Sequence, residues 1–341
     1  MVAPRVLVVG DVLLDVFIGL NAARGLSSGD AHGSRSDPGD SPRTALRHAR
    51  WHRTALGGSA ARTAQTLAAF GCRVELLACI GGDPLGDALA TALARAGVGT
   101  GGLIRVEGAA SGITTVMTAA DGHRSTTIAR GANDALSACH LQEISGADWV
   151  HASGYLLRTA GGCELARLLA AQTDSSGIGL SLDPGAPGSA AIAATVTDLL
   201  PFVTWFTPNF SEAVWLTGRD TAPEAAAALH AAGAGRVAVT CGAEGAVIAD
   251  ATGIVTIMAP RVAAAEATGP GDAFSGGLIA ATLGGLDPVA AAVVGCACGA
   301  QVVAGHPPGP GPNIEEILAR LSPAHSPHVA AALAWLRSLR R

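Results

Sequence analysis

The chain contains no lysine, so all 22 of its basic residues are arginines. Several well-known enzyme designs depend on a lysine at a fixed place. The G-x-x-x-x-G-K-[ST] phosphate loop needs one, as does the ATP-binding strand of protein kinases, and Schiff-base enzymes need its reactive amine. The absence of lysine therefore excludes these three classes.

Charge of either sign is also scarce. Only 14% of the residues are charged, and the formal net charge is −5. Proteins that bind nucleic acid usually present a basic surface, so we expect no nucleic-acid partner. The hydrophobic fraction of 49% is instead typical of a well-buried globular protein.

The chain also lacks a disulfide framework and a membrane segment. Of the seven cysteines, only Cys296 and Cys298 lie close together, and C-x-C is not the spacing of a zinc knuckle or a redox pair. The N-terminal apolar run 6–20 is interrupted by Asp11 and Asp15, which favours a strand over a signal peptide. No run is long and uncharged enough to span a membrane. We therefore expect reduced thiols and a cytoplasmic protein.

Strand-like and helix-like patterns alternate along most of the chain. A buried strand is predicted at 5–10, and helix-like runs follow residue 272 and cover 287–304. Further strands are predicted at 74–80, 149–153, 178–183, 205–208 and 236–240. Such alternation indicates a mostly parallel sheet with helices on both faces.

Two stretches depart from this alternation. Residues 22–50 are rich in Ser, Gly, Asp, Pro, His and Arg, which predicts a long flexible loop. The basic residues at its end, within 43–53, form either a solvated face or a patch that attracts an anionic substrate. Residues 113–120 and 123–130 resemble a Thr-rich hairpin that is too polar for a central sheet, so we expect a small accessory sheet.

The most informative stretch is Glu266-Ala267-Thr268-Gly269-Pro270-Gly271-Asp272, directly before an apolar helical run. Unpaired N–H groups at a helix start attract anions. The carboxylate of Asp272 would repel a phosphate if the loop only bound phosphate. It is better explained as a proton acceptor beside a loop that holds the group being transferred.

Two further carboxylates follow the first predicted strand. Asp11 and Asp15 lie where open parallel sheets bind their ligands. Asp11 is equally well explained as a helix cap, whereas Asp15 lies in an apolar stretch where a carboxylate needs a function. The next predicted helix opens with Gly57 and Gly58, which allow a ligand to approach the backbone closely.

The second half of the chain carries two more candidate motifs. Asn209 and Glu212 are three residues apart at a predicted helix start, where they are suited to hold Mg²⁺ through water or to form an ordinary capping box. Residues 240–245 form a glycine-containing turn after a strand.

Together these motifs resemble the ribokinase-like (PfkB) family of carbohydrate and nucleoside kinases over about residues 4–320. The late signature D-T-x-G-A-G-D corresponds to residues 266–272, and the early G-G-x-x-x-N-x-A corresponds to 57–64. N-x-x-E stands intact at 209–212, T-x-G-x-x-G at 240–245, and the first-strand G-x-x-x-x-D at 10–15. One such motif would be weak, but several in the family's order are specific.

The resemblance implies a three-layer α/β/α domain with a mostly parallel central sheet and a small β-sheet lid. It assigns residues 1–320 to the kinase domain, with a lid formed by about 16–56 and 108–130 that contains the flexible insertion 22–50. Residues 321–341 remain as a peripheral C-terminal helix. Lids pack against each other in many relatives, so the resemblance also implies a homodimer.

The resemblance further implies transfer of the γ-phosphoryl group of ATP to a hydroxymethyl group of a sugar or sugar-like acceptor. Asp272 would be the general base, with Gly269 and Gly271 in the anion hole. The acceptor would be bound by Asp11, Asp15, Gly57, Gly58 and Arg62, ATP by Asn209, Thr240, Gly242, Gly245, Thr268 and Gly271, and Mg²⁺, through water, by Asn209 and Glu212. Some relatives also bind K⁺ near the start of the late signature.

The sequence departs from the family pattern in several places. Pro270 replaces an alanine and removes one N–H from the expected anion hole, and Glu266 replaces an aspartate. Leu13 replaces a polar residue of ribose-specific members, which argues against ribose. Arg62 replaces an asparagine that commonly contacts sugar hydroxyls.

Arginine at position 62 is suited to an anionic acceptor, or forms a structural salt bridge with Asp15 or Asp83. Two alternatives to a sugar kinase therefore stay open: a nucleoside kinase of the same family, and a catalytically weak ligand-binding protein that keeps the fold. A dinucleotide-dependent oxidoreductase is disfavoured, because Gly10 is not part of a G-x-G-x-x-G motif.

Overall fold

The computed structural model describes residues 3–20, 49–119, 121, 123–141, 144–265, 268–321 and 326–339. The predicted flexible loop therefore lies outside the described residues, apart from its last two. Glu266 and Ala267 of the late motif and Gly122 of the hairpin turn also lie outside them.

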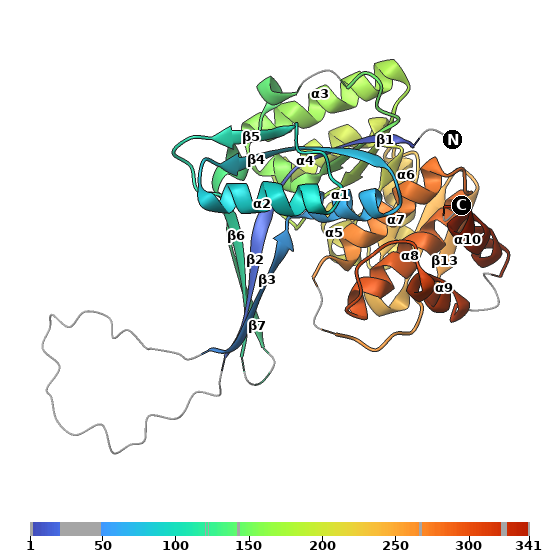
Figure 1. Cartoon of the computed structure of the whole chain (residues 1–341). Helices are drawn as coiled ribbons and strands as arrows, with labels where there is room; N and C mark the ends of the chain where they lie inside the picture. Colours follow the sequence, from blue (N-terminus) through green and yellow to red (C-terminus); the bar gives the residue numbers. More distant parts are fainter. Residues whose placement is uncertain are drawn as a thin grey trace, which may run out of the picture.

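Most described strands form one nine-stranded sheet in the order β13-β12-β11-β10-β9-β8-β1-β4-β5 (Figure 1). Its strands are β1 (Arg5–Val9), β4 (Arg73–Gly81), β5 (Leu103–Val106), β8 (Trp149–Ser153), β9 (Gly179–Asp183), β10 (Trp205–Phe206), β11 (Val237–Thr240), β12 (Ala246–Asp250) and β13 (Gly253–Ile257). From β5 to β11 all neighbours are parallel, and β12 and β13 add an antiparallel edge. The central strands are continuous apolar runs because both faces of the sheet are covered.

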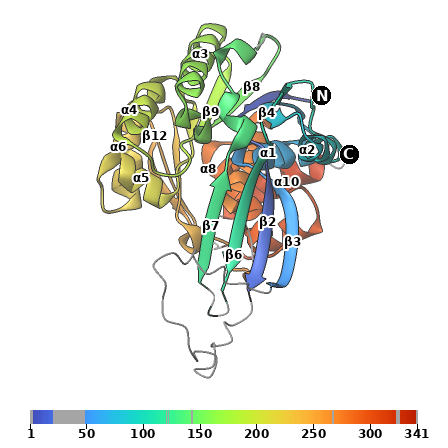
Figure 2. The same ribbon diagram turned by 90° about the vertical axis from the view of Figure 1, so that its left-hand side faces the viewer.

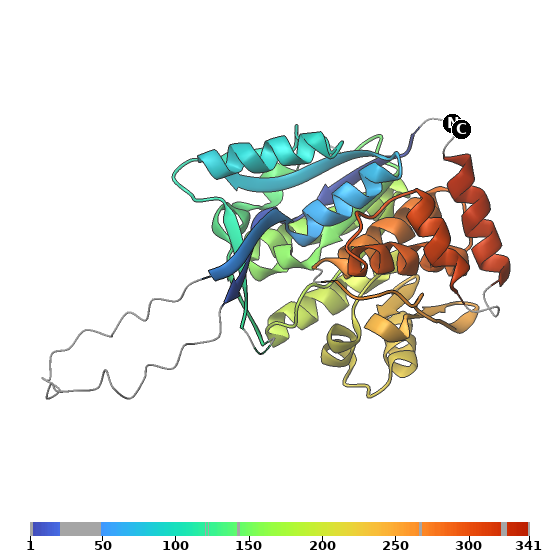
Figure 3. The ribbon, with the colours of Figure 1, turned by 60° about the horizontal axis from the view of Figure 1, so that its bottom comes forward.

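Helices cover both faces of this sheet. One face packs against α1 (Ser59–Ala69), α2 (Pro84–Arg95), α7 (Pro270–Leu283), α8 (Pro288–Val303), α9 (Pro312–Ala319) and α10 (Ser326–Ser338). The other packs against α3 (Ala160–Ser176), α4 (Ala190–Leu199), α5 (Phe210–Thr217) and α6 (Ala222–Ala231). Figure 3 shows α1, in blue, beside the orange and red helices that follow residue 270. The predicted three-layer α/β/α arrangement with a mostly parallel sheet is confirmed.

A smaller four-stranded sheet stands apart from the central one (Figure 2). Its order is β3 (Ala49–Gly57), β2 (Leu13–Leu20), β6 (Gly112–Thr118) and β7 (Arg124–Ala129). The antiparallel pair β6–β7 confirms the predicted hairpin. Buried and half-buried residues alternate along β2, as expected for a strand with one covered face.

The chain passes from the central sheet to the small sheet between Gly10 and Leu13. The side chain of Asn133 clamps this crossing. Its Oδ1 accepts a hydrogen bond from the Val12 N–H at 2.9 Å, and its Nδ2 donates to the Val12 carbonyl at 3.0 Å. Both backbone groups of Val12 are therefore satisfied where the chain leaves the sheet.

Some elements were not predicted from the sequence. The loop assigned to 22–50 extends too far, because Ala49 and Arg50 already belong to β3. The first six residues of β3 are all exposed, so they show no alternation of apolar and polar residues by which a strand could be recognised. Their strand conformation comes from the antiparallel pairing with β2. The short strand β5 and the helices α4 and α6 were also missed.

The last described helix, α10, joins the layer of helices on the α1 face of the sheet. Trp335 stacks on Phe70 with 5.5 Å between ring centroids. None of the helices in the described part of the chain combines the length and apolarity needed to cross a bilayer.

The fully buried His151 on β8 predicts a specific acid sensitivity. Its Nδ1 lies 2.9 Å from Ser181 Oγ, and burial lowers its pKa from 6.5 to about 4. The unfolded chain therefore takes up a proton at this residue as the pH falls below about 6.5, while the folded protein resists protonation until about pH 4. We expect roughly 3 kcal/mol of unfolding free energy to be lost over this interval.

Urea unfolding at pH 7.5 and pH 4.5 measures this loss. His151→Met should flatten the pH dependence because no titratable group remains there, whereas the exposed control His123→Gln should keep the wild-type slope. Equal slopes in wild type and His151→Met would contradict the assignment.

Candidate active site

The candidate residues gather at the carboxyl ends of the central parallel strands. Asp11 follows β1, Asp183 ends β9, and Asn209 comes shortly after β10. Helix α7 brings Asp272, in its first turn, close to the same edge, where burial and the charge of Asp272 raise the pKa of Asp183, and burial and the charge of Asp11 raise the pKa of Asp272. This is the edge at which open parallel sheets bind ligands.

The carboxylate of Asp11 is used as a helix cap. It accepts hydrogen bonds from the backbone N–H groups of Ser59 and Ala60 and from Ser153 Oγ, each at 3.3 Å. The N-cap residue of α1, Gly58, has no side chain to offer, and its φ of 97° brings the position where a Cβ would stand to 2.5 Å from the Asp11 carbonyl oxygen. Of the two sequence interpretations of Asp11, the structure favours the cap.

Arg62 links three elements at the centre of the site. Its guanidinium forms a short ion pair with Asp15 on β2 and another with Asp272 on α7, at 3.2 Å between Nη1 and Oδ2. The Asp15 carboxylate is 3% exposed, so its charge depends on this arginine. The salt bridge expected with Asp15 is present, whereas Asp83 caps α2 through the Gly86 N–H.

The electrostatics of this cluster keep Asp272 reactive. Burial raises the pKa of Asp272 to about 6, and Arg62 and the hydroxyl of Ser59 limit the rise. Burial also raises the pKa of Asp15. Burial alone would lower the pKa of Arg62, but Asp272 and Asp15 outweigh it and raise that pKa. Asp272 is thus an ionised carboxylate at neutral pH with the basicity of a proton acceptor.

The start of α7 has the geometry of an anion site. Gly269 is its N-cap with a φ of 90°, and a Cβ there would approach Arg62 Cδ to 2.5 Å, so only glycine fits. Pro270 opens the helix without an N–H, and the Ala273 N–H bonds back to the Gly269 carbonyl. The N–H groups of Gly271 and Asp272 remain as first-turn donors without an acceptor one turn earlier in the helix.

A groove of about 950 Å³ lies beside this site. Asn209, Glu212, Thr240 and Gly242 all line it. The N-terminus of α5 and the turn after β11 are held together there by a parallel bridge between Asn209 and Thr240. Gly245 lies behind this lining, where a Cβ would stand 1.9 Å from the Ile257 carbonyl oxygen.

Asn209 and Glu212 form the capping box that the sequence allows. Asn209 Oδ1 accepts from the Glu212 N–H at 3.0 Å, and Glu212 Oε2 accepts from the Asn209 N–H at 2.8 Å. Burial raises the pKa of Glu212 to about 7, and burial together with Glu212 and Asp272 raises the pKa of Asp183 well above its usual range. The structure therefore holds a set of mutually repelling carboxylates along the groove.

Such a set is suited to a divalent cation that arrives with a ligand. Within the described ranges, no three or more His, Cys, Asp or Glu side chains are arranged to hold a metal directly. Mg²⁺ keeps several waters and is often bound through one or two carboxylates plus phosphate oxygens, which fits Glu212 and its neighbours. The potassium expectation falls partly on Glu266, which lies outside the described residues.

Four further candidates line a second cavity of about 510 Å³. Asp15, Arg62, Thr268 and Gly269 share this lining. A Cβ at Gly57 would stand 2.2 Å from Asp15 Oδ1, so the glycine lets β3 lie close to that carboxylate. The structure thus brings the acceptor and catalytic candidates together around Arg62 and most of the nucleotide candidates together along the groove.

Sequence reasoning missed Tyr155, the only tyrosine in the chain. It lines the groove, and burial together with Asp11 and Asp183 raises its pKa to about 12. Ser153 was also missed as a partner of Asp11. Ser153 ends the strand predicted at 149–153, and Tyr155 follows it by two residues. Their position at the carboxyl end of a predicted parallel strand could have marked both as site candidates.

The chain is similar to known kinases in sequence and in fold. A sequence profile described as pfkB family carbohydrate kinase matches residues 35–313. The ribokinase of Haemophilus influenzae is 30% identical over 241 residues, which cover 68% of this chain and 76% of the relative.

Two solved structures share the fold. Arabidopsis thaliana ribokinase, complexed with ribose and ATP, has a TM-score of 0.74 at 20% identity and covers 94% of this chain and 98% of its own. The aminoimidazole riboside kinase of Salmonella enterica, complexed with aminoimidazole riboside and an ATP analogue, has a TM-score of 0.69 at 21% identity and covers 88% of this chain and 93% of its own.

The Arg62 ion pairs predict a large, pH-dependent stability effect. Arg62→Gln leaves two buried carboxylates without a cation, which should cost about 3–5 kcal/mol of unfolding free energy at pH 8. Burial raises the pKa values of Asp15 and Asp272 and Arg62 lowers them, so without this arginine both pKa values rise further and the folded variant binds protons more readily than the folded wild type. The loss should therefore shrink as the pH falls to 5.

Urea unfolding of both proteins at the two pH values checks this expectation. Arg105→Gln is the control, since its ion pair with Asp87 is exposed and should be worth less than about 1 kcal/mol. A deficit for Arg62→Gln no larger than that of the control would show that the ion pairs do not support the fold.

Proposed function

The chain belongs to the pfkB family of carbohydrate kinases, which are phosphotransferases with an alcohol group as acceptor. On this premise we propose that it transfers the γ-phosphoryl group of ATP to a hydroxymethyl group of a sugar or sugar-like acceptor. The observation that carries the proposal is the place of Asp272. It is a buried carboxylate with a pKa of about 6 at the N-terminus of α7, between the groove and the Arg62 cavity.

Asp272 acts as the general base in this proposal. At neutral pH it is ionised, so it can accept the proton of the acceptor hydroxyl as the oxygen attacks phosphorus. Arg62 keeps the carboxylate in place at 3.2 Å and limits the rise of its pKa. Below about pH 6 the carboxylate becomes protonated, and turnover should fall.

The N–H groups of Gly271 and Asp272 serve as the anion hole for the moving phosphoryl group. Pro270 takes the first helical position, where its fixed φ favours the helix but no N–H is available. The anion hole therefore has one N–H donor fewer than it would have with an alanine at position 270. We expect the enzyme to turn over, but at a modest kcat.

ATP binds along the groove in this proposal, with its phosphates directed to the start of α7. Support comes from the shared lining by Asn209, Glu212, Thr240 and Gly242, and from the ATP complex of a ribokinase with the same fold. Magnesium would be held through water by Glu212 and Asn209, where it would neutralise charge on the transferred phosphoryl group.

The acceptor binds in the cavity beside Arg62, between the small sheet and α7. Since Arg62 already faces Asp15 and Asp272, its charge is balanced. This supports an uncharged polyhydroxyl acceptor over the anionic one that the sequence also allowed. A ribonucleoside stays open as the second candidate, because a riboside kinase shares the fold.

The small sheet is the lid in this proposal, closing over the acceptor and excluding water so that ATP is not hydrolysed. We include in the proposal that two lids pack together in a homodimer, for which the exposed side chains Trp51 and Ile128 on this sheet offer apolar area. ADP release measured over a panel of sugars and nucleosides tests the proposed activity. ATP binding without turnover on any acceptor would favour a ligand-binding protein instead.

Asp272→Asn should lower kcat by about 10³-fold, because the amide cannot take the proton of the acceptor. The affinity for ATP should stay within about threefold, since the base acts on the acceptor. Steady-state kinetics and calorimetric ATP titration measure the two effects. A residual kcat within tenfold of the wild-type value would remove Asp272 from the role of base.

Glu212→Gln should separate magnesium binding from helix capping. Glutamine can replace glutamate in a capping box, so stability should change little, whereas the Mg²⁺ concentration for half-maximal activity should rise about tenfold. Glu224→Gln, at the matching first-turn position of α6, is the control and should leave both unchanged. An unaltered Mg²⁺ requirement in Glu212→Gln would leave this residue with a capping role alone.

A further inference from the structure

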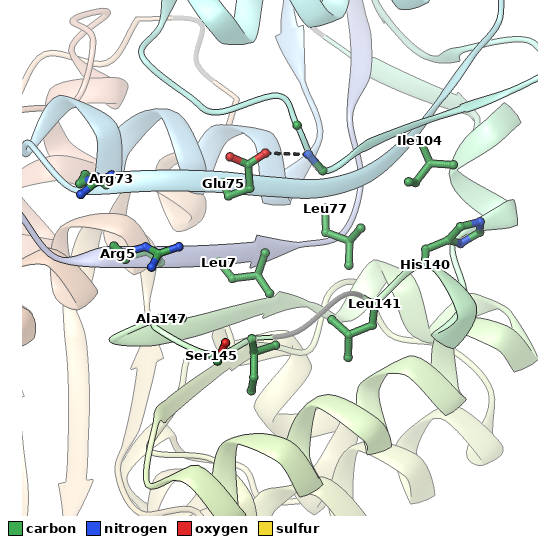
Figure 4. A pocket seen from close by; sticks show the side chains of 14 residues that line it. Arg5, Leu7, Arg73, Glu75, Leu77, Ile104, His140, Leu141, Ser145 and Ala147 are labelled. Atoms are coloured by element: carbon green, nitrogen blue, oxygen red, sulfur yellow. Dashed lines mark hydrogen bonds between the residues drawn. The ribbon is translucent and has the colours of Figure 1, made fainter.

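A third cavity, of about 430 Å³, lies away from the groove and the Arg62 site (Figure 4). It is lined by the first halves of β1 and β4, by Ile104 of β5 with the two glycines before that strand, and by residues 140, 141, 144, 145 and 147. Asp11 follows the carboxyl end of β1, whereas Arg5 begins that strand, so the cavity and the candidate active site lie toward opposite ends of β1. Nothing in the proposed kinase reaction uses it.

Two arginines stand side by side at one end of this cavity. Arg5 and Arg73 are direct register partners on the parallel strands β1 and β4, which places their side chains on the same face of the sheet. Figure 4 shows both at the end away from Ile104 and His140. Like charges directly opposite on neighbouring strands destabilise a sheet, so this pairing needs a compensating reason.

Two carboxylates, Asp148 and Glu75, lie near this pair, but within the described ranges neither forms an ion pair with it. Neither guanidinium takes part in an ion pair there. Asp148 accepts from the backbone N–H of Arg5 at 2.8 Å, and Glu75 Oε1 accepts from the Gly102 N–H at 2.6 Å. Both carboxylates are therefore engaged with backbone groups.

The rest of the lining is mostly apolar. Leu7 and Leu77 extend from the sheet between the arginines and Ile104, and Leu141 lies on the opposite side of the cavity. Ile144 adds a further apolar side chain to the lining. The cavity thus has an apolar part, which could accommodate the hydrocarbon portion of a small ligand, next to the guanidinium groups of Arg5 and Arg73. Guanidinium pairs bind the oxygens of carboxylates and phosphates through several parallel hydrogen bonds.

We propose that this cavity is a binding site for a small organic oxyanion, a carboxylate or a phosphate monoester with an apolar body, distinct from the catalytic site. The oxyanion lies between Arg5 and Arg73, and the apolar body covers Leu7 and Leu77.

Calorimetric titration at saturating ATP tests the site, with phenyl phosphate and hexanoate as probes. Saturating ATP occupies the groove, so binding there does not contribute. Binding of phenyl phosphate alone identifies a phosphate ligand, and binding of both probes identifies a general oxyanion site. Phenol and inorganic phosphate, each with half of the required chemistry, should bind at least tenfold more weakly than the better probe.

Arg5→Gln and Arg73→Gln should each weaken the better probe about tenfold, since each removes charged hydrogen bonds. Arg95→Gln, an exposed arginine at the end of α2, is the matched control and should not change the affinity. In the absence of probe, Arg73→Gln should unfold at the wild-type temperature or above it, because it relieves the repulsion between the two arginines.

A purely structural role of the pair would instead lower the melting temperature of Arg73→Gln. Affinities unchanged by both substitutions, or no binding of either probe at about 10 mM, would overturn the proposal. Neither result depends on catalysis, so the proposal and the kinase assignment stand or fall separately.

Discussion

The candidate active site depends on the ion pairs of a single half-buried arginine, Arg62, with carboxylates from two other elements. Arg62 on α1 joins Asp15 of the small sheet to Asp272 of α7, so the acceptor side, the proposed base and the helix between them are positioned by one guanidinium. Buried carboxylates without a cation would take up protons or leave the site. The ion pairs therefore serve the fold and the ionised state of Asp272 together.

On the groove side of the site, the carboxylates are not balanced by an arginine within the described residues. Burial, Glu212 and Asp272 raise the pKa of Asp183, burial and Asp272 raise the pKa of Glu212, and within the described residues neither Asp183 nor Glu212 forms an ion pair with an arginine. A magnesium ion that arrives with the nucleotide would relieve this repulsion. In the proposed reaction, the arrangement would couple the binding of the cation to that of ATP, because neither the carboxylates alone nor the phosphates alone are electrostatically balanced.

Both ends of the central sheet collect charge, but in different ways. At the carboxyl end, backbone donors, carboxylates and Arg62 form a partly closed network. At the other end, Arg5 and Arg73 stand together without a described carboxylate partner above an apolar cavity. Strand β1 runs between the two regions, with Arg5 at its start and Asp11 shortly after its end.

The sequence by itself determined the fold class, because the alternation of buried strands and helices and the glycine motifs are local patterns that each element carries alone. It also located Asp272, Asn209 and Glu212 at helix starts. Only the tertiary structure decided what these residues do to each other. Arg62 and Asp272 are 210 positions apart in sequence, so no local pattern could show that they pair.

The same reason explains the other differences. Asp11 is a cap because α1 packs its N-terminus on the end of β1, and β3 is a strand because β2 offers its hydrogen-bonding edge. Tyr155 and Asp183 join the site because neighbouring parallel strands end at one level. Long-range packing sets burial, and burial sets pKa values, so the chemistry of the site could be assigned only once the chain was folded.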